Sequence, residues 1–473
     1  MDDRISELSD DILSYILTVL SVKDLLKTSI LSRRWCKLWA VRRDLFFDIF
    51  MLGTTEHDLL QSGYLVNASD TEDKQVNLDK CAGVFVERVD QFIKNFQGTI
   101  IDSFLVNFYL DCEHSDIIDQ WVSFAIERGV GRMDLLFLGT PYKHCTTRRD
   151  PYKFDLALFS KTNLSTLNHL SLENCLVYNP INFDFIPFKN LRSLSLVSAK
   201  LDETFLESLL SNCPRLQELF LICCELKSLP VIVSSSLCHL KVLCCDLVFN
   251  DLKVDANLFL VDCLRLASLE CELDTLSIKT PMLKSGKFSI SRKQDLKAFV
   301  ALCATFPQLE ILHVEIFPMV KTSIQITQPF KCLKQLNLVL FADSFIYDMG
   351  YGLLWILNML QASPLLQKLS IMFLAPEFFE NQKDIRDVEI LSHDDIRVIE
   401  LRGCVGNWYE IEFVKNVLKC AHKLEQIVLS PYWTEVDGFS WNSHPLWFKG
   451  GRERMGEKLK DEVVVGREKL VFI

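Results

Sequence analysis

A single apolar motif recurs along most of the chain and constrains its fold more than any other feature. The motif is L-x-x-L-x-L followed by Asn, Cys or a small residue, and clear copies begin at Leu167, Leu191, Leu216 and Leu237, with successive starts 24, 25 and 21 residues apart. Alternating apolar residues predict a short strand with one buried face, and their recurrence predicts a stack of such strands. Further copies begin at Leu273, Leu309, Leu333, Leu366, Ile396 and Leu424, and weaker ones at Ile101, Val130, Phe249 and Leu283.

The spacing of these copies is typical of leucine-rich repeats, whose period is about 20 to 29 residues. We therefore predict an α/β fold, a solenoid with a curved parallel sheet and helical or irregular return segments. Proline ends a helix shortly before the next strand at three places. The return segments expected to be helical are residues 203–212, 295–305 and 351–362, followed by Pro214, Pro307 and Pro364.

Composition and charge indicate a folded protein and argue against a nucleic-acid binder. Hydrophobic residues make up 49% of the 473 residues and charged residues 24%, which is typical of a globular protein. The chain has 51 Lys and Arg against 62 Asp and Glu, so its formal net charge is −11. A protein that binds the phosphate backbone needs a basic face, which this balance does not favour.

The cysteine content and the N-terminal sequence predict a reducing compartment. The 17 cysteines contain no C-x-x-C pair, and no basic segment with a cleavage site follows Met1. The apolar run from Ile12 to Val22 is about half the roughly 20 residues that cross a bilayer. We expect no transmembrane segment and a location in the cytoplasm, the nucleus or both.

The first forty residues predict three short helices with more apolar surface than they can bury. Ser9 caps a helix that runs to Leu20, Ser21 caps a second, and a third carries Trp35 and Trp39. Segments below about 40 residues seldom hold a core alone. The helices therefore either pack on the rest of the chain or bind the surface of a partner.

Residues 4–40 resemble a plant F-box. The resemblance is carried by R-I-S-E-L-S-D-D-I-L at 4–13, by Lys23-Asp24, and by T-S-I-L-S-R-R-W-C-K-L-W at 28–39. It implies a three-helix module that docks on the Skp-type adaptor of a cullin-based SCF ubiquitin ligase. Serine stands at 9 and 21 where the family often has proline, and serine also starts helices well. The docking residues that the resemblance implies are Leu8, Ile12, Leu13, Ile16, Leu25, Leu31, Trp35 and Leu38.

The C-terminal part resembles the FBD domain that closes many plant F-box proteins with leucine-rich repeats. The resemblance rests on the strand motif at 396–404, a helix over 410–421 and a second motif at 424–429. Three tryptophans, Trp433, Trp441 and Trp447, then predict a cap on the last repeat, with a helix from 452 and a final apolar strand. The predicted domains are an F-box at 1–45, a linker or long loop at 46–80, leucine-rich repeats at 81–385, the FBD domain at 386–431 and a C-terminal cap at 432–473.

No motif predicts catalysis, a metal site or a cofactor. Gly129-Val130-Gly131 lacks the third glycine of a dinucleotide fingerprint and leads into a strand rather than a helix. The pairs Cys223-Cys224 and Cys244-Cys245 lack the usual spacing of zinc ligands. Because Cys224 and Cys245 occupy the same position in two repeats, we interpret them as core residues.

The residues between the motif leucines predict a binding surface on the concave face of the sheet. An apolar stripe there could receive a target protein, or flanking loops could cover it. The candidate residues are Phe220, Ile222, Leu243, Ile311, His313, Val339, Met372 and Val398.

The sequence thus predicts an adaptor rather than an enzyme. By resemblance, it would be the substrate-recognition subunit of an SCF ubiquitin ligase, with the F-box on the Skp adaptor and the repeats on an unidentified target. One alternative is a repeat scaffold that never enters a ligase. Another is a small-molecule co-receptor, as in hormone-sensing relatives, but the net charge of −11 gives no support to an anionic ligand.

Overall fold

The computed structural model divides the chain into two compact units. The first comprises Met1–Leu237 and Lys241–Cys263, and the second Cys238–Leu240 and Leu264–Ile473. The residues that the structure describes are 7–9, 12–13, 16, 43–52, 72–137, 150–161, 166–178, 183–202, 204–227, 231–249, 252–255, 259–272, 276–290, 302, 305–316, 329–341, 353–379, 382–388, 392–434, 441–443, 445–462 and 466–473.

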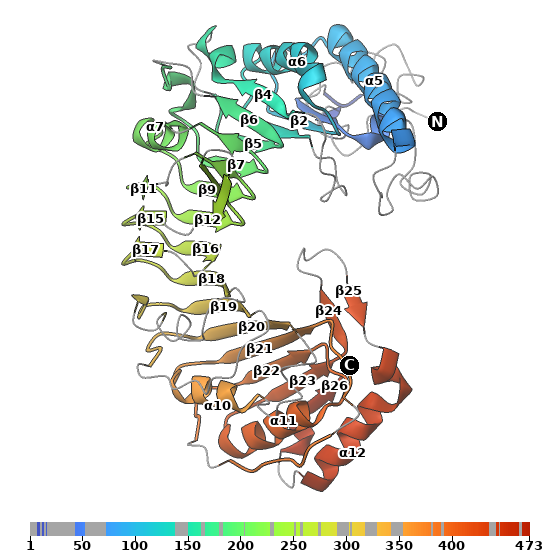
Figure 1. Ribbon diagram of the computed structural model, residues 1–473, viewed down its shortest axis with the longest axis vertical. Helices are drawn as coiled ribbons and strands as arrows, with labels where there is room; N and C mark the ends of the chain where they lie inside the picture. The colour runs from blue at the N-terminus through green and yellow to red at the C-terminus, as the bar shows by residue number, and fades with distance from the viewer. Residues whose placement is uncertain are drawn as a thin grey trace. The chain divides into compact units, whose positions relative to one another are not determined.

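The first unit contains a series of short strands in chain order (Figure 1). Each neighbouring pair from the first to the sixth strand is parallel. The seventh, β12, lies at the boundary of the unit. The strands are β1 (Asp44–Phe47), β2 (Ser103–Asn107), β3 (Arg132–Leu136), β5 (His169–Glu173), β7 (Ser193–Val197), β9 (Glu218–Ile222) and β12 (His239–Leu243).

The second unit continues the same pattern with strands that are parallel to their neighbours throughout. The strands are β16 (Ser268–Glu272), β18 (Ser285–Ile290), β19 (Ile311–Ile316), β20 (Gln335–Phe341), β21 (Lys368–Leu374), β22 (Val398–Arg402), β23 (Gln426–Ser430) and β26 (Leu470–Phe472).

Burial alternates along these strands as the leucine motif predicts. In β9, Leu219 and Leu221 are fully buried, whereas the residues beside them are partly exposed. Fully burying one such side chain contributes about 1.5–3 kcal/mol, so the stacked leucines make the core of each unit. The predicted α/β architecture with parallel repeat strands is confirmed. The three-helix F-box lies almost entirely outside the described residues.

Two predicted repeats are wrong, and two strands were missed. The motif at Phe249 overlaps β13 (Asp246–Phe249), and the motif at Leu273 leads into β17 (Leu276–Lys279); both strands belong to smaller sheets. The repeat of the main series is instead Leu266-x-x-Leu269-x-Cys271, in which cysteine replaces the third leucine. The first strand, β1, lies just after the F-box segment and carries only two buried residues, Leu45 and Phe47.

A left-handed residue follows several strands and turns the chain into a second sheet. Asn174, Ser198, Cys223 and Cys244 have φ values of 55°, 50°, 53° and 51°. Their cost, about 1–2 kcal/mol each, is offset by hydrogen bonds between repeats, as where the Ser198 amide donates to the Ile222 carbonyl at 2.8 Å. The second sheet has the order β14 (Leu252–Asp255), β13, β10 (Glu225–Leu226), β8 (Lys200–Leu201), β6 (Cys175–Tyr178), β4 (Tyr152–Asp155). A three-stranded sheet contains β11 (Val231–Val233), β15 (Phe259–Asp262) and β17.

Helices form several of the return segments. The predictions at 203–212, 351–362 and 410–421 are confirmed by α7 (Phe205–Asn212), α10 (Leu354–Gln361) and α11 (Trp408–Cys420). Most of the predicted helix at 295–305 lies outside the described residues. In the first unit, α6 (Ser115–Glu127) buries Trp121 and Val122.

The predicted linker at 46–80 differs from the structure at both of its ends. Its first residues complete β1 and form the short helix η2 (Ile49–Leu52), and its last residues begin the long helix α5 (Glu72–Asn95). The helix packs through Phe85, Val89 and Phe92, which are buried. The prediction was wrong at this end because the acidic and polar residues at the start of α5 have a composition typical of a loop. Residues 53–71 lie outside the described part.

The C-terminal residues cover the edge of the last strands. Helix α12 (Arg452–Glu462) follows the kinked segment Trp447–Gly451, and β26 pairs with β23. The Trp447 indole, which is buried, donates to the Ile473 carbonyl at 3.0 Å, and Arg452 donates to the Phe472 carbonyl at 3.2 Å. The second bond occupies a carbonyl group of the outer strand β26 that would otherwise be open to another chain.

Candidate binding surfaces

The exposed face of the strands in the first unit carries a small apolar surface. Phe220 and Ile222 of β9 and Leu243 of β12 alternate with buried leucines and are half-buried. Val197 of β7 pairs in register with Ile222 and belongs to the same surface. Three of the predicted concave-face residues thus lie on neighbouring strands of one unit.

The same face of the second unit is dominated by charge rather than by apolar residues. Lys287 of β18 lies between Glu270 of β16 and Glu315 of β19, at 2.9 and 3.0 Å. Burial alone would raise the pKa of Glu315, but the neighbouring His313, Lys287 and Ser289 outweigh it and lower that pKa to about 2. Lys287 and Ser289 each lie 3.0 Å from the carboxylate, and His313 lies 3.7 Å from it. The predicted residue His313 therefore belongs to an ion-pair network.

A second group of charges continues this pattern on later strands. Glu400 of β22 pairs with Lys368 of β21 at 2.7 Å and with Arg402 at 3.0 Å. Burial of Glu400 raises its pKa, but the two cations lower it by more than burial raises it. The pKa of Glu400 is therefore below its ordinary value. Ile311, which is 41% exposed, and the half-buried Val398 lie at the starts of their strands. The apolar stripe predicted for this face is therefore interrupted by charge.

The last two predicted residues of this surface lie on β20 and β21. Val339 is buried, at 6% exposure. The sulfur of Met372 accepts a hydrogen bond from the Thr434 hydroxyl at 3.6 Å. Thr434 belongs to β24 (Tyr432–Thr434), which pairs with β25 (Trp441–Ser443). Met372 therefore contacts another segment of the chain, as the alternative of a covered face predicted.

The cysteine pairs lie in the turns after β9 and β12. The Cys224 thiol donates to the Leu196 carbonyl at 3.3 Å, and the Cys245 thiol donates to the Leu221 carbonyl at 3.5 Å. The two thiols therefore link successive repeats in an equivalent way, as expected for one repeat position. Among the described residues, no group of three or more His, Cys, Asp and Glu side chains could hold a metal ion.

The candidate docking residues of the F-box are described only in part. Ile12 and Ile16 are 49% and 39% exposed, Leu8 is half-buried, and Leu13 is fully buried. Helical geometry is visible where the Leu13 amide donates to the Ser9 carbonyl at 2.9 Å. Leu25, Leu31, Trp35 and Leu38 lie outside the described residues.

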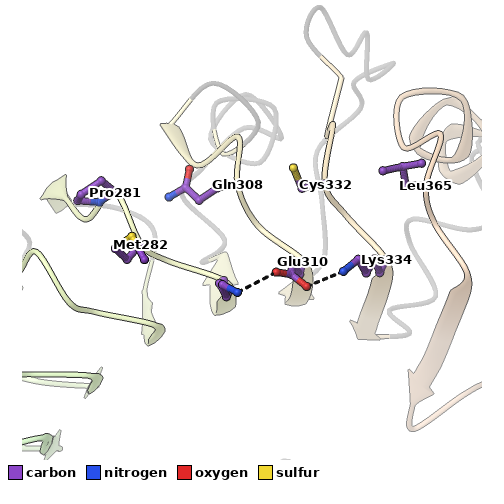
Figure 2. Close-up of a pocket in the computed structure, with 8 residues that line it drawn as sticks. Pro281, Met282, Gln308, Glu310, Cys332, Lys334 and Leu365 are labelled. Carbon is purple, nitrogen blue, oxygen red and sulfur yellow. Dashed lines mark hydrogen bonds and ion pairs between the residues drawn. The ribbon is translucent and has the colours of Figure 1, made fainter.

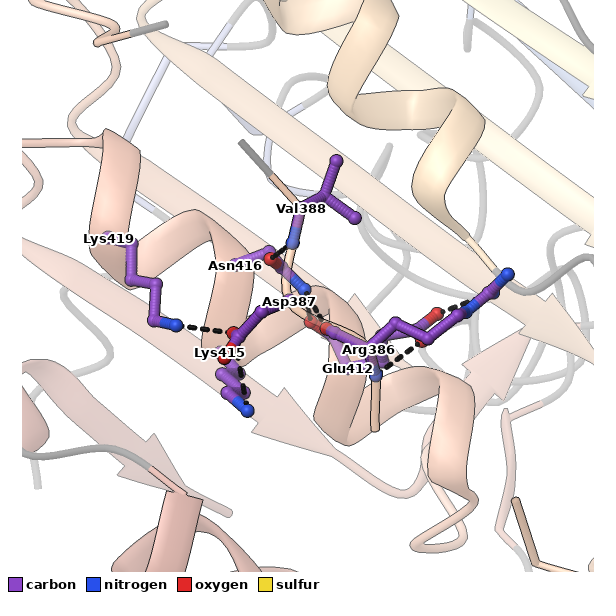
Figure 3. Close-up of polar contacts among 7 residues, drawn as sticks. All are labelled: Arg386, Asp387, Val388, Glu412, Lys415, Asn416 and Lys419. Carbon is purple, nitrogen blue, oxygen red and sulfur yellow. Dashed lines mark hydrogen bonds and ion pairs between the residues drawn. The ribbon is translucent and has the colours of Figure 1, made fainter. Parts of the chain in front are cut away.

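A buried polar cluster on α11 was not predicted from the sequence. The segment formed by residues 382–388, which we call the strap, lies on this helix and is held by its polar side chains (Figure 3). Arg386 donates two hydrogen bonds to Glu412, from Nε at 2.8 Å and from Nη2 at 3.0 Å. Asn416 accepts from the Val388 amide at 2.9 Å and donates to the Arg386 carbonyl at 3.0 Å.

Two further contacts complete this arrangement. Lys415 and Lys419 both pair with Asp387 of the strap, Lys415 at 3.3 Å. At the start of the helix, the buried Glu410 carboxylate accepts from the Gly406 amide at 2.9 Å. Burial raises the pKa of Glu410 to about 7, although hydrogen bonds from Gly406, Val405 and Asn407 act in the opposite direction. The buried polar groups of α11, Glu410, Glu412, Lys415 and Asn416, therefore serve to hold chain segments rather than to face solvent.

Comparison with family models gives two matches in one chain. The F-box domain model matches residues 5–46, and the model for the leucine-rich-repeat domain of At1g61320/AtMIF1 matches residues 92–444. The second match covers most of the chain. The chain belongs to the plant F-box/FBD/LRR-repeat family. The repeat match of this F-box/LRR-repeat protein extends beyond residue 385, where we placed the end of the repeats, and includes residues 386–431.

Relatives of this F-box/LRR-repeat protein are named for an F-box together with an FBD domain, and one of them also for leucine-rich repeats. The chain is 31% identical over 218 residues to FBD-associated F-box protein At5g56370 and 30% identical over 224 residues to F-box/FBD/LRR-repeat protein At4g00160, both from Arabidopsis thaliana. Each match covers 46% of this chain, and the chain spans only 42% and 41% of these relatives. The two matched models describe an F-box and a leucine-rich-repeat domain, in agreement with the prediction of an adaptor rather than an enzyme.

Within the described residues, no helix combines the length and the apolar character that crossing a bilayer requires.

Proposed function

We propose that this protein is the substrate-recognition subunit of an SCF-type ubiquitin ligase. The observation that carries the proposal is the presence of an F-box match at 5–46 and a repeat match at 92–444 in the same chain. An F-box implies binding to a Skp-type adaptor in general, and the repeats supply a long surface for a second partner. The cullin would then be reached through the adaptor, and the protein would work in the cytoplasm or the nucleus.

The adaptor would dock on the apolar side chains of the F-box. Ile12 and Ile16 lie one helical turn apart and are both exposed, so they form one small apolar face in the isolated chain. Exposed apolar side chains at this spacing are typical of a helix that binds a partner. Leu8, Leu25, Leu31, Trp35 and Leu38 are proposed to complete the surface, whereas the buried Leu13 would support it from within.

The target protein would bind the exposed face of the repeat strands. The apolar surface of the first unit, Val197, Phe220, Ile222 and Leu243, is our first candidate, because it brings four half-buried apolar side chains together on neighbouring strands. Ile311, His313, Val339, Met372 and Val398 stay weaker candidates, since charge or another segment occupies their surroundings. Holding the target near the ubiquitin-loaded conjugating enzyme would accelerate ubiquitin transfer by proximity, and other subunits would carry out the chemistry.

The proposal is tested by reconstituting the full chain with purified Skp-type adaptor and cullin. The proposal predicts one complex of all three proteins by size-exclusion chromatography, and no complex of cullin and chain without the adaptor. Limited proteolysis of the isolated chain adds a separate readout. If residues 5–46 resist the protease in the isolated chain and the adaptor does not bind, the chain is a free-standing repeat scaffold instead.

A further inference from the structure

A pocket of about 320 Å³ opens at the edge of the second unit, beside the starts of four neighbouring strands (Figure 2). The segments that precede β18, β19, β20 and β21 supply its walls. Four of the lining residues occupy one repeat position, directly before the first motif leucine. These residues are Met282, Gln308, Cys332 and Leu365.

This position is polar in most other repeats of the chain. The N-terminal pair of repeats has Ile100 and Gly129 there. A solvent-facing position that turns apolar in three of four neighbouring repeats is not required by the core, because the adjacent leucines already fill it. The seven remaining repeats have Thr166, Asn190, Arg215, Ser236, Arg265, Asp395 and Lys423.

The apolar side chains of the pocket are unusually open to water. Met282 is 56% and Leu365 is 44% exposed, and Pro281 extends the same wall. An exposed apolar hollow with a few polar groups at its rim is typical of a binding site. The volume lies at the small end of the range for ligand pockets and is enough for one large apolar side chain.

The rim of the pocket is positively charged although the whole chain carries −11. Glu310 lies between two lysines, with Lys284 at 3.3 Å and Lys334 at 2.8 Å. Within the described residues 279–286, 305–311, 329–335 and 362–368, Glu310 is the single acidic residue. The lysines of these segments are Lys279, Lys284, Lys331, Lys334 and Lys368, of which Lys368 pairs with Glu400.

We propose that this pocket binds a short acidic segment of a partner protein, with one apolar side chain of that segment in the pocket. Carboxylates on either side of this anchor would pair with Lys284 and Lys334, which are 63% and 53% exposed and can turn toward a ligand. Charge complementarity favours an acidic segment, and the apolar walls select its central residue. The inference rests on the proposed function only in naming the partner as a ligase target.

The test begins with a phage-displayed library of random linear peptides, selected on the full-length protein. The proposal predicts that enriched peptides share an apolar residue flanked by Asp or Glu. One enriched peptide is then synthesised with a fluorescent label, and its affinity is measured by fluorescence polarisation. We expect binding to weaken as the salt concentration rises, because exposed ion pairs are screened.

Variants at the shared repeat position show whether the peptide uses the pocket. Met282→Thr with Leu365→Asn introduces residues that other repeats carry at this position, so the fold should persist, as circular dichroism can check. We expect affinity to fall about tenfold or more, as for an apolar anchor in an interface. Lys284→Gln with Lys334→Gln should also weaken binding, mostly at low salt. Val231→Thr with Val233→Thr, exposed on β11, is the matched control.

Three outcomes would overturn the inference. They are the absence of any enriched peptide, enriched peptides without the acidic and apolar pattern, and equal binding by the wild type and the Met282 and Leu365 variant. Binding of the wild type and of the same variant to the Skp-type adaptor is measured in parallel. Failure of the wild type to bind the adaptor would contradict the proposed function and leave the peptide result interpretable.

Discussion

Arg386 and Glu412 form a two-pronged ion pair that links the strap to helix α11. Two guanidinium nitrogens contact the two carboxylate oxygens at 2.8 and 3.0 Å, and the Arg386 amide also donates to Glu412 at 3.0 Å. The Glu412 side chain is fully buried, whereas that of Arg386 is 48% exposed. A buried carboxylate with one exposed cationic partner makes this pair a sensitive point of the second unit.

Removing Arg386 should therefore destabilise the protein. In Arg386→Ala, the buried Glu412 carboxylate would keep the hydrogen bond from the backbone amide of residue 386 but lose the guanidinium group. This loss should lower the free energy of unfolding by about 2 kcal/mol. The matched control is Arg397→Ala. Arg397 pairs with Glu425 at 2.9 Å, but both side chains are about half exposed, so the expected loss is about 0–1 kcal/mol. Urea unfolding of both variants checks the difference, and equal losses would contradict it.

The pH dependence of stability should report on Glu410. Its pKa in the folded protein is raised by burial to about 7, above the ordinary value of 4.5. The folded state therefore holds this proton more tightly than the unfolded state, and the contribution to stability is full below pH 4.5 and is lost as the pH rises to about 7. Glu410→Gln should flatten this decline. Urea unfolding at a series of pH values compares the two proteins, and parallel curves would show that Glu410 is not responsible.

Lys287 should contribute more to the stability of the protein near neutral pH than in acid. Its ammonium group pairs with both Glu270 and Glu315. Removing it would leave the negative charges of these two carboxylates without their shared cation. Lys287→Met should lower stability by about 1–2 kcal/mol at pH 7, since the network is partly open to solvent. The loss should shrink toward pH 4, where the carboxylates take up protons more readily than in the wild type. A loss that is independent of pH would instead indicate a packing effect.

The glycine after β22 should tolerate no side chain. Gly403 has a φ of +71°, and a Cβ there would lie 2.3 Å from the Phe373 carbonyl oxygen. Gly403→Ala should cost about 2–4 kcal/mol, because backbone strain and the clash with a neighbouring strand add. Gly83 of α5 is the control, since a Cβ there meets nothing within 4 Å. Gly83→Ala should be neutral or stabilise by up to about 1 kcal/mol, as thermal unfolding can measure.

The repeat architecture could be predicted because the leucine pattern and the burial pattern have the same physical cause. Alternate residues of a strand point to opposite faces, so the buried Leu219 and Leu221 are visible in the sequence itself. The prediction failed at β16, where Cys271 fills the place of the third leucine and is equally buried. A leucine pattern cannot detect a small apolar substitute, and it matches by chance at Leu273, where it predicts a repeat that the main sheet does not contain.

The binding surfaces were less predictable, since they depend on contacts between strands. Phe220 and His313 stand at equivalent places in their motifs, but only His313 has an acidic neighbour two residues later, Glu315, that is shared with Lys287. The buried polar residues of α11 look like a solvated helix face in the sequence. Their partners come from a strap about 26 residues earlier, as between Arg386 and Glu412, a separation that no local pattern reveals.

The central claim is that the F-box of this chain docks on a Skp-type adaptor, and a titration of the full-length protein with purified adaptor tests it most directly. The wild type is compared by calorimetry with Ile12→Asp, Ile16→Asp, which charges the exposed face and leaves the buried Leu13 unchanged. Val231→Asp, Val233→Asp places the same charges on another exposed apolar site. We predict that the wild type and this control bind and that the Ile12 and Ile16 variant does not. Failure of the wild type to bind, or equal binding by all three, would contradict the claim.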